Sequence, residues 1–158
     1  MAHIFQINIS DGGVPKLPIT QAEVSALGVK GDRQRNTKHH GGPDRALCLF
    51  SLEHILGLQA EGNPIFPGAS GENITIQGLD WPTLLPGDQF QLGDEVIIEL
   101  TSHTVPCHNL EPYFQEGKFS RISQKTHPGW ARFYARVLQP GSIGIGDRVT
   151  KLKEKENV

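Results

Sequence analysis

Short apolar runs, separated by glycine and proline, most constrain what this chain can fold into. The sequence has 18 glycines and 11 prolines among 158 residues, which is a poor composition for a helical bundle. Three Gly-Asp pairs border such runs, at 87–88, 93–94 and 146–147. Glycine supplies a positive φ and aspartate bonds the backbone across a turn, so these pairs predict tight connections between strands. The pattern predicts a mainly β fold, a barrel with a few short helices.

The apolar pattern also predicts where individual elements lie. Alternation favours a first strand at His3–Ile9, and the continuous apolar run Ala46–Phe50 favours a strand buried on both faces. Ser51 can cap a helix that ends by Gly62–Pro64. We expect Asp11–Pro18 to be a loop or irregular edge, further strands at Asn73–Gln77, Gln89–Leu92, Glu95–Thr101, Gly129–Leu138 and Arg148–Leu152, and a helical turn at Asn109–Glu116.

Length and composition indicate one globular domain over residues 1–158, with a charged tail at 151–158 that we expect to fray. No stretch approaches the roughly 18 apolar residues of a membrane span, and the N-terminus lacks the features of a signal peptide. The two cysteines do not suggest a disulfide framework, so we expect a reducing, cytoplasmic setting. A net charge of −2 argues against non-specific binding of nucleic acid.

Cys107 is the strongest candidate for chemistry. It follows the strand expected at Glu95–Thr101, and Pro106 directly before it should end strand pairing. A loop or helix start at Cys107 would expose the thiol, and an imidazole from His103 or His108 would favour the thiolate. A small, inert, buried cysteine is the alternative. A zinc hydrolase that uses Cys107 with one of these histidines is a further hypothesis.

Cys48 has a different context. It lies inside the apolar run Ala46–Phe50, which predicts a small buried side chain within a strand. The chain contains no Cys-x-x-Cys pair, which argues against a thioredoxin-like site or a zinc knuckle. We therefore expect Cys107 at the mouth of the barrel, at least partly exposed, and Cys48 buried.

A second candidate site is the basic segment from Lys30 to Arg45. It combines cations, imidazoles and a Gly-Gly step within a short stretch. Gly41 and Gly42 would let backbone N–H groups approach a ligand closely, and Arg45 can bind a phosphate with two parallel hydrogen bonds. The segment therefore suits a small anion. A solvated basic loop on the surface is the alternative.

Taken in order, several motifs together resemble a MOSC domain of the stand-alone bacterial type. This domain also forms the C-terminal part of molybdenum-cofactor sulfurases. The resemblance runs from about Gly28 to Val149, and the set is specific because its members occur in the family's order. The matching motifs are GDRQ (31–34), HHGGPDRALCLFS (39–51), GENITIQGLDW (71–81), GDQFQLGD (87–94), VPC (105–107) and GWARFYARVLQPGSIGIGD (129–147).

The resemblance implies a MOSC-type β-barrel that binds the molybdenum cofactor (molybdopterin), with Cys107 as metal ligand or sulfur carrier. It implies reduction of N-hydroxylated compounds, as in the mitochondrial amidoxime-reducing component, or sulfur transfer for assembly of metal–sulfur clusters or cofactors. A soft thiolate suits molybdenum. The residues that would bind the cofactor, in part through its pterin phosphate, are Lys30, Arg33, His40, Gly41, Gly42, Arg45 and Asn73.

The resemblance also bears on partners. The chain has no ferredoxin-type cysteine cluster, so we expect a separate electron-donor or sulfur-donor protein, a small-molecule substrate, and no nucleic acid or membrane. The alternative function is a non-catalytic module that binds a phosphate-bearing small molecule through the basic segment. If the cofactor hypothesis is right, the basic segment and Cys107 should line one pocket, with the thiolate at one end and cations at the other.

Overall fold

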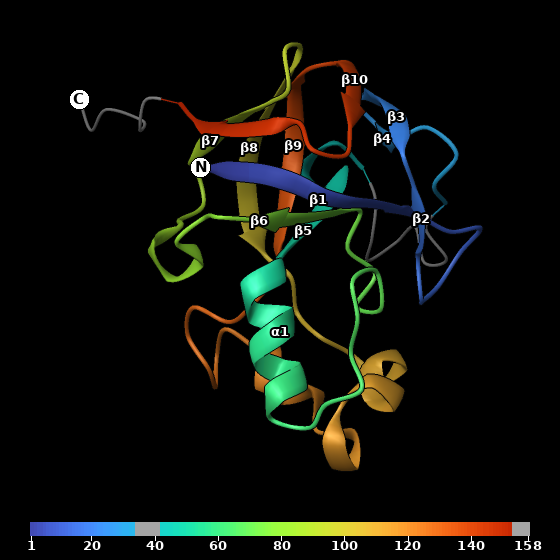
Figure 1. Cartoon of the computed structure of the whole chain (residues 1–158), viewed down its shortest axis with the longest axis vertical. Coiled ribbons are helices and arrows are strands. Elements are labelled where there is room, and N and C mark those ends of the chain that lie inside the picture. Colours follow the sequence, from blue (N-terminus) through green and yellow to red (C-terminus); the bar gives the residue numbers. More distant parts are fainter. Residues whose placement is uncertain (34–41, 153–158) are drawn as a thin grey trace.

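The computed structural model describes residues 1–33 and 42–152. Within these ranges, seven strands form a ring that the pairing of β1 with β11 closes (Figure 1). Closure leaves the ring without a free edge and confirms the predicted mainly β barrel. In order around the barrel, the strands are β11 (Arg148–Lys151), β7 (Gln89–Leu92), β8 (Val96–His103), β9 (Phe133–Gln139), β5 (Leu47–Ser51), β6 (Ile74–Gln77) and β1 (Ala2–Ile9).

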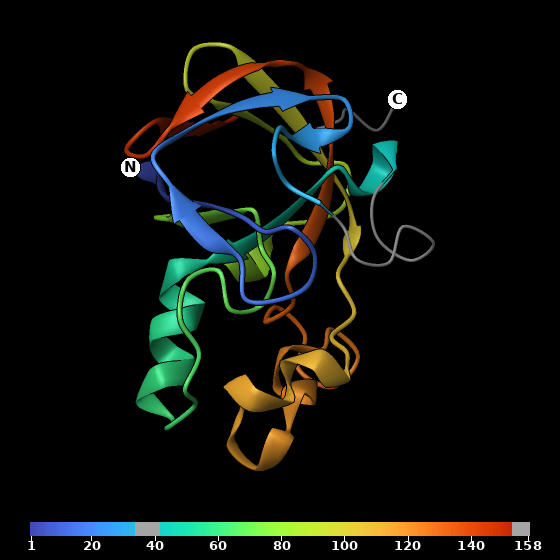
Figure 2. The same ribbon diagram turned by 90° about the vertical axis from the view of Figure 1, so that its right-hand side faces the viewer.

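The remaining strands extend the barrel on one side. β2 (Leu17–Ile19) pairs with the end of β1, and β3 (Gln21–Ser25) forms a small sheet with β4 (Gly28–Val29) and β10 (Gly141–Gly144). Figure 2 shows this small sheet toward the end of the molecule opposite the helix. The residue pattern did not predict β3, β4 or β10. β4 has two residues, β10 has three glycine or serine residues among its four, and β3 has Val24 as its one buried residue, so these strands offer little apolar alternation to detect.

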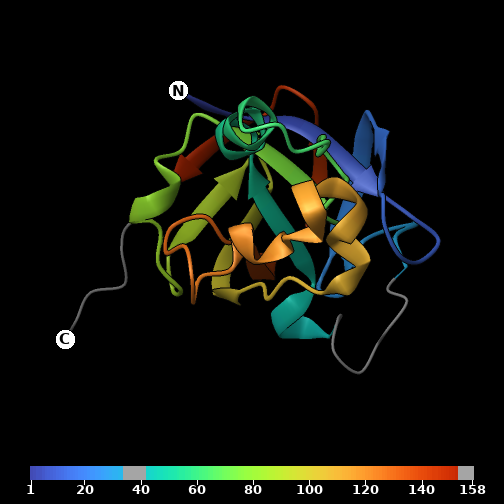
Figure 3. The same cartoon turned by 90° about the horizontal axis from the view of Figure 1, so that it is seen from below.

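The helical segments gather at the other end of the barrel, where Figure 3 shows them covering it. They are α1 (Leu52–Ala60) and the 3₁₀ helices η3 (His108–Tyr113), η4 (Gln115–Gly117) and η5 (Phe119–Ile122). Two further 3₁₀ helices, η1 (Pro43–Arg45) and η2 (Trp81–Thr83), connect strands. In the described ranges, no helix is both long and apolar enough to cross a membrane.

Several local predictions are confirmed. All five residues of β5 are buried, and the Ser51 hydroxyl accepts a hydrogen bond from the His54 backbone N–H at 3.1 Å, which caps α1. The predicted tail begins too early. Lys151 is the last residue of β11, and the Leu152 N–H donates to the Gln89 carbonyl at 2.8 Å. Residues 153–158 lie outside the described residues.

A buried ion pair joins the loop after β1 to the segment after β4. Lys16 Nζ lies 2.6 Å from Asp32 Oδ1, and the two side chains are only 5% and 6% exposed. The Ser10 N–H also donates to Asp32 Oδ1, at 2.9 Å, and Asn73 Nδ2 donates to Asp32 Oδ2 at 2.8 Å. Asn73 Oδ1 in turn accepts from the Cys48 backbone N–H at 3.0 Å. One carboxylate therefore ties two loops to the adjacent strands β5 and β6.

Replacing Asp32 should strongly destabilise the fold. Asp32→Ala leaves the Lys16 ammonium buried without its partner, which should cost about 3–5 kcal/mol of unfolding free energy. Arg33→Ala is the matched control, because Arg33 is 75% exposed in its contact with Asp11, and it should change stability by no more than about 0.5 kcal/mol. Urea denaturation measures both. Equal losses in the two variants would contradict the proposed importance of the pair.

Glu72 is a fully buried carboxyl group beside this network. Its two oxygens accept hydrogen bonds from the hydroxyl groups of Ser70, at 2.7 Å, and Thr75, at 2.9 Å. Burial raises the pKa of Glu72, and these hydrogen bonds offset only part of that rise. The folded state therefore holds the Glu72 proton more tightly than the unfolded chain does.

This difference predicts a pH dependence of stability. As pH rises above about 4.3, the pKa of a free glutamate, the unfolded chain loses this proton first, so the contribution of Glu72 to stability falls. Glu72→Gln should remove that fall, and the exposed Glu111→Gln should keep it. Urea denaturation between pH 4 and pH 8 gives the comparison. The same pH dependence in wild type and Glu72→Gln would show that the carboxyl is ionised in the folded protein.

Candidate functional site

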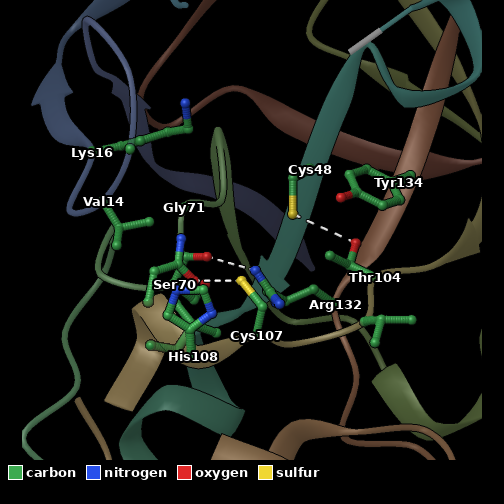
Figure 4. A pocket seen from close by; sticks show the side chains of 14 residues that line it. Val14, Lys16, Cys48, Ser70, Gly71, Thr104, Cys107, His108, Arg132 and Tyr134 are labelled. Carbon is green, nitrogen blue, oxygen red and sulfur yellow. Dashed lines mark hydrogen bonds between the residues drawn. The ribbon is translucent and has the colours of Figure 1, made fainter. Parts of the chain in front are cut away.

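A cavity of about 250 Å³ lies between the helical end of the barrel and the loop after β1 (Figure 4). Five separate segments contribute to its wall: the loop after β1, β5, the loop before β6, the segment after β8, and the start of β9. The side chains with polar or reactive groups that line it are Lys16, Cys48, Ser70, Thr104, Cys107, His108, Asn109, Arg132 and Tyr134.

Cys107 occupies the position that the sequence predicted. The Thr104 N–H still pairs with the Arg132 carbonyl at 2.8 Å, Pro106 follows, and Cys107 is extended directly before η3. The thiol is partly exposed, and its Sγ donates to Asn109 Oδ1 at 2.5 Å. The end of strand pairing thus places a reachable thiol in the cavity wall.

Cys48 is buried within β5, as predicted, and its sulfur lies 3.7 Å from the Thr104 hydroxyl. Burial raises the pKa of the Cys48 thiol, so the sulfur stays protonated and unreactive at neutral pH. Nothing in the sequence pattern indicated that Cys48 lines the same cavity as Cys107. Two thiols with different exposure therefore share one site.

Two cations in the cavity wall were not among the predicted site residues. Lys16 comes from the loop after β1 and is paired with Asp32, whereas Arg132 comes from the segment just before β9 and is only 5% exposed. Arg132 Nη1 donates to the Ser70 carbonyl at 2.5 Å, as Figure 4 shows. The sequence feature that could have pointed to Arg132 is its position as a charged residue among the aromatic and aliphatic residues of Gly129–Leu138.

Tyr134 also faces the cavity, and burial raises its pKa to about 12. Its hydroxyl therefore remains protonated at physiological pH and can donate a hydrogen bond to a ligand. The Arg45 guanidinium lies 5.2 Å from the centre of the Tyr134 ring, on which it makes a cation–π contact. Through this contact, the C-terminal end of the basic segment comes next to the cavity wall.

The other predicted cofactor residues that the structure describes are not among those lining this cavity. Lys30 is exposed, and Arg33 pairs with Asp11 at 3.8 Å on the surface. Asn73 is fully buried, with its amide engaged by Asp32 and the Cys48 backbone. Gly42, with φ +81°, directly precedes η1. His40 and Gly41 lie outside the described residues.

The histidines near Cys107 do not form a metal site with it. His108 lines the cavity, but the His103 ring packs against Phe133 with their centres 4.5 Å apart, and His103 lines a different pocket. Across residues 1–33 and 42–152, no group of three or more His, Cys, Asp or Glu side chains is placed to hold a metal ion. The described part of the chain gives the zinc-hydrolase hypothesis no ligand set.

Comparison with known proteins places this barrel in a family. The MOSC domain model matches residues 36–150, and the chain belongs to the MOSC family. It is 32% identical over 128 residues to YflK of Bacillus subtilis, covering 80% of this chain and 57% of YflK. It is 34% identical over 135 residues to a Gibberella moniliformis protein named "Reductase", covering 82% of this chain and 23% of that protein.

A solved structure shows the same fold. The crystal structure of YiiM from Geobacillus stearothermophilus superposes with a TM-score of 0.77 at 26% identity, covering 97% of this chain and 76% of YiiM. The present chain therefore spans little more than half the length of YflK and about three quarters of the YiiM chain.

The two thiols should react very differently. In the folded protein at pH 7.5, N-ethylmaleimide should modify Cys107 and leave Cys48 free, because Cys48 is buried and each unit of raised pKa lowers the thiolate fraction about tenfold. Mass spectrometry of tryptic peptides identifies the modified residue. Cys107→Ser should take up no reagent until urea unfolds it. Equal labelling of Cys48 and Cys107 in the folded wild type would contradict this assignment.

Proposed function

We propose that this MOSC protein binds the molybdenum cofactor through the Cys107 thiolate and acts in reduction of N-hydroxylated small molecules or in sulfur transfer. One observation carries the proposal: a partly exposed thiol lines a cavity whose charged side chains, Lys16 and Arg132, are both cations. When bound, the cofactor would supply the redox or sulfur chemistry of its metal centre.

The donor set fits such a group. Thiolate sulfur is a soft ligand and suits molybdenum. The cavity of about 250 Å³ is just below the range of about 300–1,000 Å³ typical of sites for whole drug-sized ligands. It therefore suits one end of a larger molecule. Arg45, held against Tyr134 beside this cavity, is suited to bind a phosphate at the other end.

The surrounding side chains have separate tasks in this proposal. Asn109 accepts the hydrogen bond of the protonated Cys107 thiol, and the sulfur gives up this bond when it loses its proton to act as a thiolate. Tyr134 keeps its hydroxyl proton and can donate a hydrogen bond to a bound oxygen or nitrogen atom. Cys48 remains a neutral thiol, so it does not compete with Cys107 as a ligand.

The two reaction types need different co-reactants. Reduction of an N–OH group to N–H consumes two electrons and two protons and releases water, so a separate electron-donor protein must supply the electrons. In sulfur transfer, the Cys107 thiolate attacks the terminal sulfur of a donor persulfide, forms its own persulfide and releases the donor thiolate. The name of the fungal relative supports the reductive reaction, although this chain covers only 23% of that protein.

The second candidate function is a non-catalytic module that binds a phosphate-bearing small molecule. The cationic character of the cavity favours this alternative as well, since binding an anion needs no thiolate. If the protein is such a module, Cys107→Ser should keep its affinity for the ligand. If Cys107 is a metal ligand or sulfur carrier, the same variant should lose the protein's function.

Metal and pterin analysis of protein from a host that makes the cofactor tests the proposal. Wild type should retain molybdenum and pterin in equal amounts. Cys107→Ala should lose activity and most of its molybdenum even if some pterin remains, because the soft ligand is gone. Arg45→Ala should retain less of both without removing the thiolate.

Arg136→Ala is the control, because Arg136 pairs with Glu99 at 3.1 Å outside the cavity. Inductively coupled plasma mass spectrometry and fluorescence of the oxidised pterin give the two contents. If neither Cys107→Ala nor Arg45→Ala alters cofactor content or activity, the molybdenum assignment fails and the family fold remains.

A further inference from the structure

We propose that the Cys107 cavity binds an oxoanion, such as a carboxylate or phosphate group of a small molecule, on the buried guanidinium of Arg132. The inference takes the role of Cys107 from the proposed function, on which it rests. It adds that the ligand bound beside this thiol is negatively charged. Its test needs no cofactor, so the two proposals can fail separately.

The first observation is a guanidinium with unused hydrogen-bond donors. Arg132 is only 5% exposed, and of its five N–H bonds one reaches the Ser70 carbonyl, from Nη1 at 2.5 Å. Nε is buried and has no acceptor among the described residues. Buried donors are nearly always paired, so an unpaired one on a cavity-lining arginine indicates a missing acceptor.

The second observation is the lack of a counterion. No aspartate or glutamate is among the described residues that line the cavity, and none in those ranges forms an ion pair with Arg132. Lys16, the other cation there, has Asp32 as its partner. A buried positive charge without a negative partner is costly, and an anionic ligand would relieve that cost.

Glu72, which binds the Ser70 hydroxyl, is a candidate for an internal counterion, and its own contacts argue against that role. Its oxygens accept from the Ser70 and Thr75 hydroxyl groups. Burial raises the pKa of this carboxyl, which favours its neutral form. The protein thus supplies Arg132 with the carbonyl of Ser70 and leaves the charge itself unmatched.

The geometry defines the class of ligand. The planar guanidinium binds carboxylate and phosphate oxygens with parallel hydrogen bonds, and the protonated Tyr134 hydroxyl is a further donor in the same cavity. The volume of about 250 Å³ limits the enclosed part to a small group. Cys107 lines the same space, so the bound anion would lie close to the reactive sulfur (Figure 4).

Two alkylating reagents that differ in charge test this on cofactor-free protein. Iodoacetate and iodoacetamide both react when the Cys107 thiolate attacks their methylene carbon and iodide leaves, but only iodoacetate carries a carboxylate. Arg132→Gln should lower the ratio of the iodoacetate rate to the iodoacetamide rate by about tenfold, the loss of one charge-assisted hydrogen bond. Arg136→Gln, which removes an exposed arginine from β9, the strand that follows Arg132, should leave the ratio unchanged.

Sulfate provides a second readout that needs no variant. At constant ionic strength, replacing chloride by sulfate should slow iodoacetate labelling of wild type more than iodoacetamide labelling. Sulfate should also raise the melting temperature of wild type more than that of Arg132→Gln, in which only the general stabilisation by an excluded salt remains. In Arg132→Gln the selective slowing of iodoacetate should disappear, and stability without sulfate should equal or exceed that of wild type. A purely structural Arg132 would instead give a less stable variant, the same sulfate shift in melting temperature for both proteins and no selective slowing of iodoacetate, and this result would overturn the proposal.

The loaded protein distinguishes the two sources of the anion. If the phosphate of the bound cofactor occupies Arg132, sulfate should raise the melting temperature of cofactor-free protein more than that of loaded protein. If the site belongs to an anionic substrate, both forms should show the same shift, larger than that of Arg132→Gln. Absence of the selective slowing of iodoacetate in cofactor-free wild type overturns the anion site, even if Arg132→Gln does not fold. Selective slowing in a protein that never retains molybdenum would keep the anion site and overturn the proposed function.

Discussion

The buried ion pair between Lys16 and Asp32 is the interaction on which the site depends. Asp32 also accepts hydrogen bonds from Ser10 and Asn73, and Asn73 holds the backbone of Cys48. A buried pair adds little net stability, but losing one partner is expensive, so it fixes the positions of the chains that carry it. The ion pair thereby fixes the loop after β1, which carries Lys16, in its place in the cavity wall.

The cavity separates two chemically similar groups by environment alone. Cys48 lies inside β5, where burial keeps its thiol protonated, whereas Cys107 follows Pro106 at the point where strand pairing ends and remains partly exposed. Around them, Lys16 has its own carboxylate, whereas the described residues offer Arg132 the Ser70 carbonyl and no carboxylate. This imbalance of charge is the basis of the proposed anion site beside a soft nucleophile.

Family membership and cavity chemistry contribute different parts of the functional argument. The match to the MOSC family over residues 36–150 and the likeness to YiiM establish the fold. The proposed role of Cys107 is implied by the family resemblance, and the access and neighbours of this thiol support it. Arg45 connects the two arguments, because it belongs to a family-like motif and also packs on Tyr134 in the cavity wall.

Local residue patterns were enough to predict the barrel, the Ser51 helix cap and the different settings of Cys48 and Cys107, because turns, caps and burial follow from such patterns. It did not reveal that both cysteines, Lys16 and Arg132 share one cavity. Lys16 lies in a proline-containing loop. Arg132 precedes a strand whose residue pattern indicates which side chains are buried but not which distant residues they contact. Their meeting depends on which strands pair and in what register, as where the Thr104 N–H bonds the Arg132 carbonyl. Tertiary structure alone decides such contacts, because pairing between distant segments is set by closure of the whole barrel and not by any one segment's periodicity.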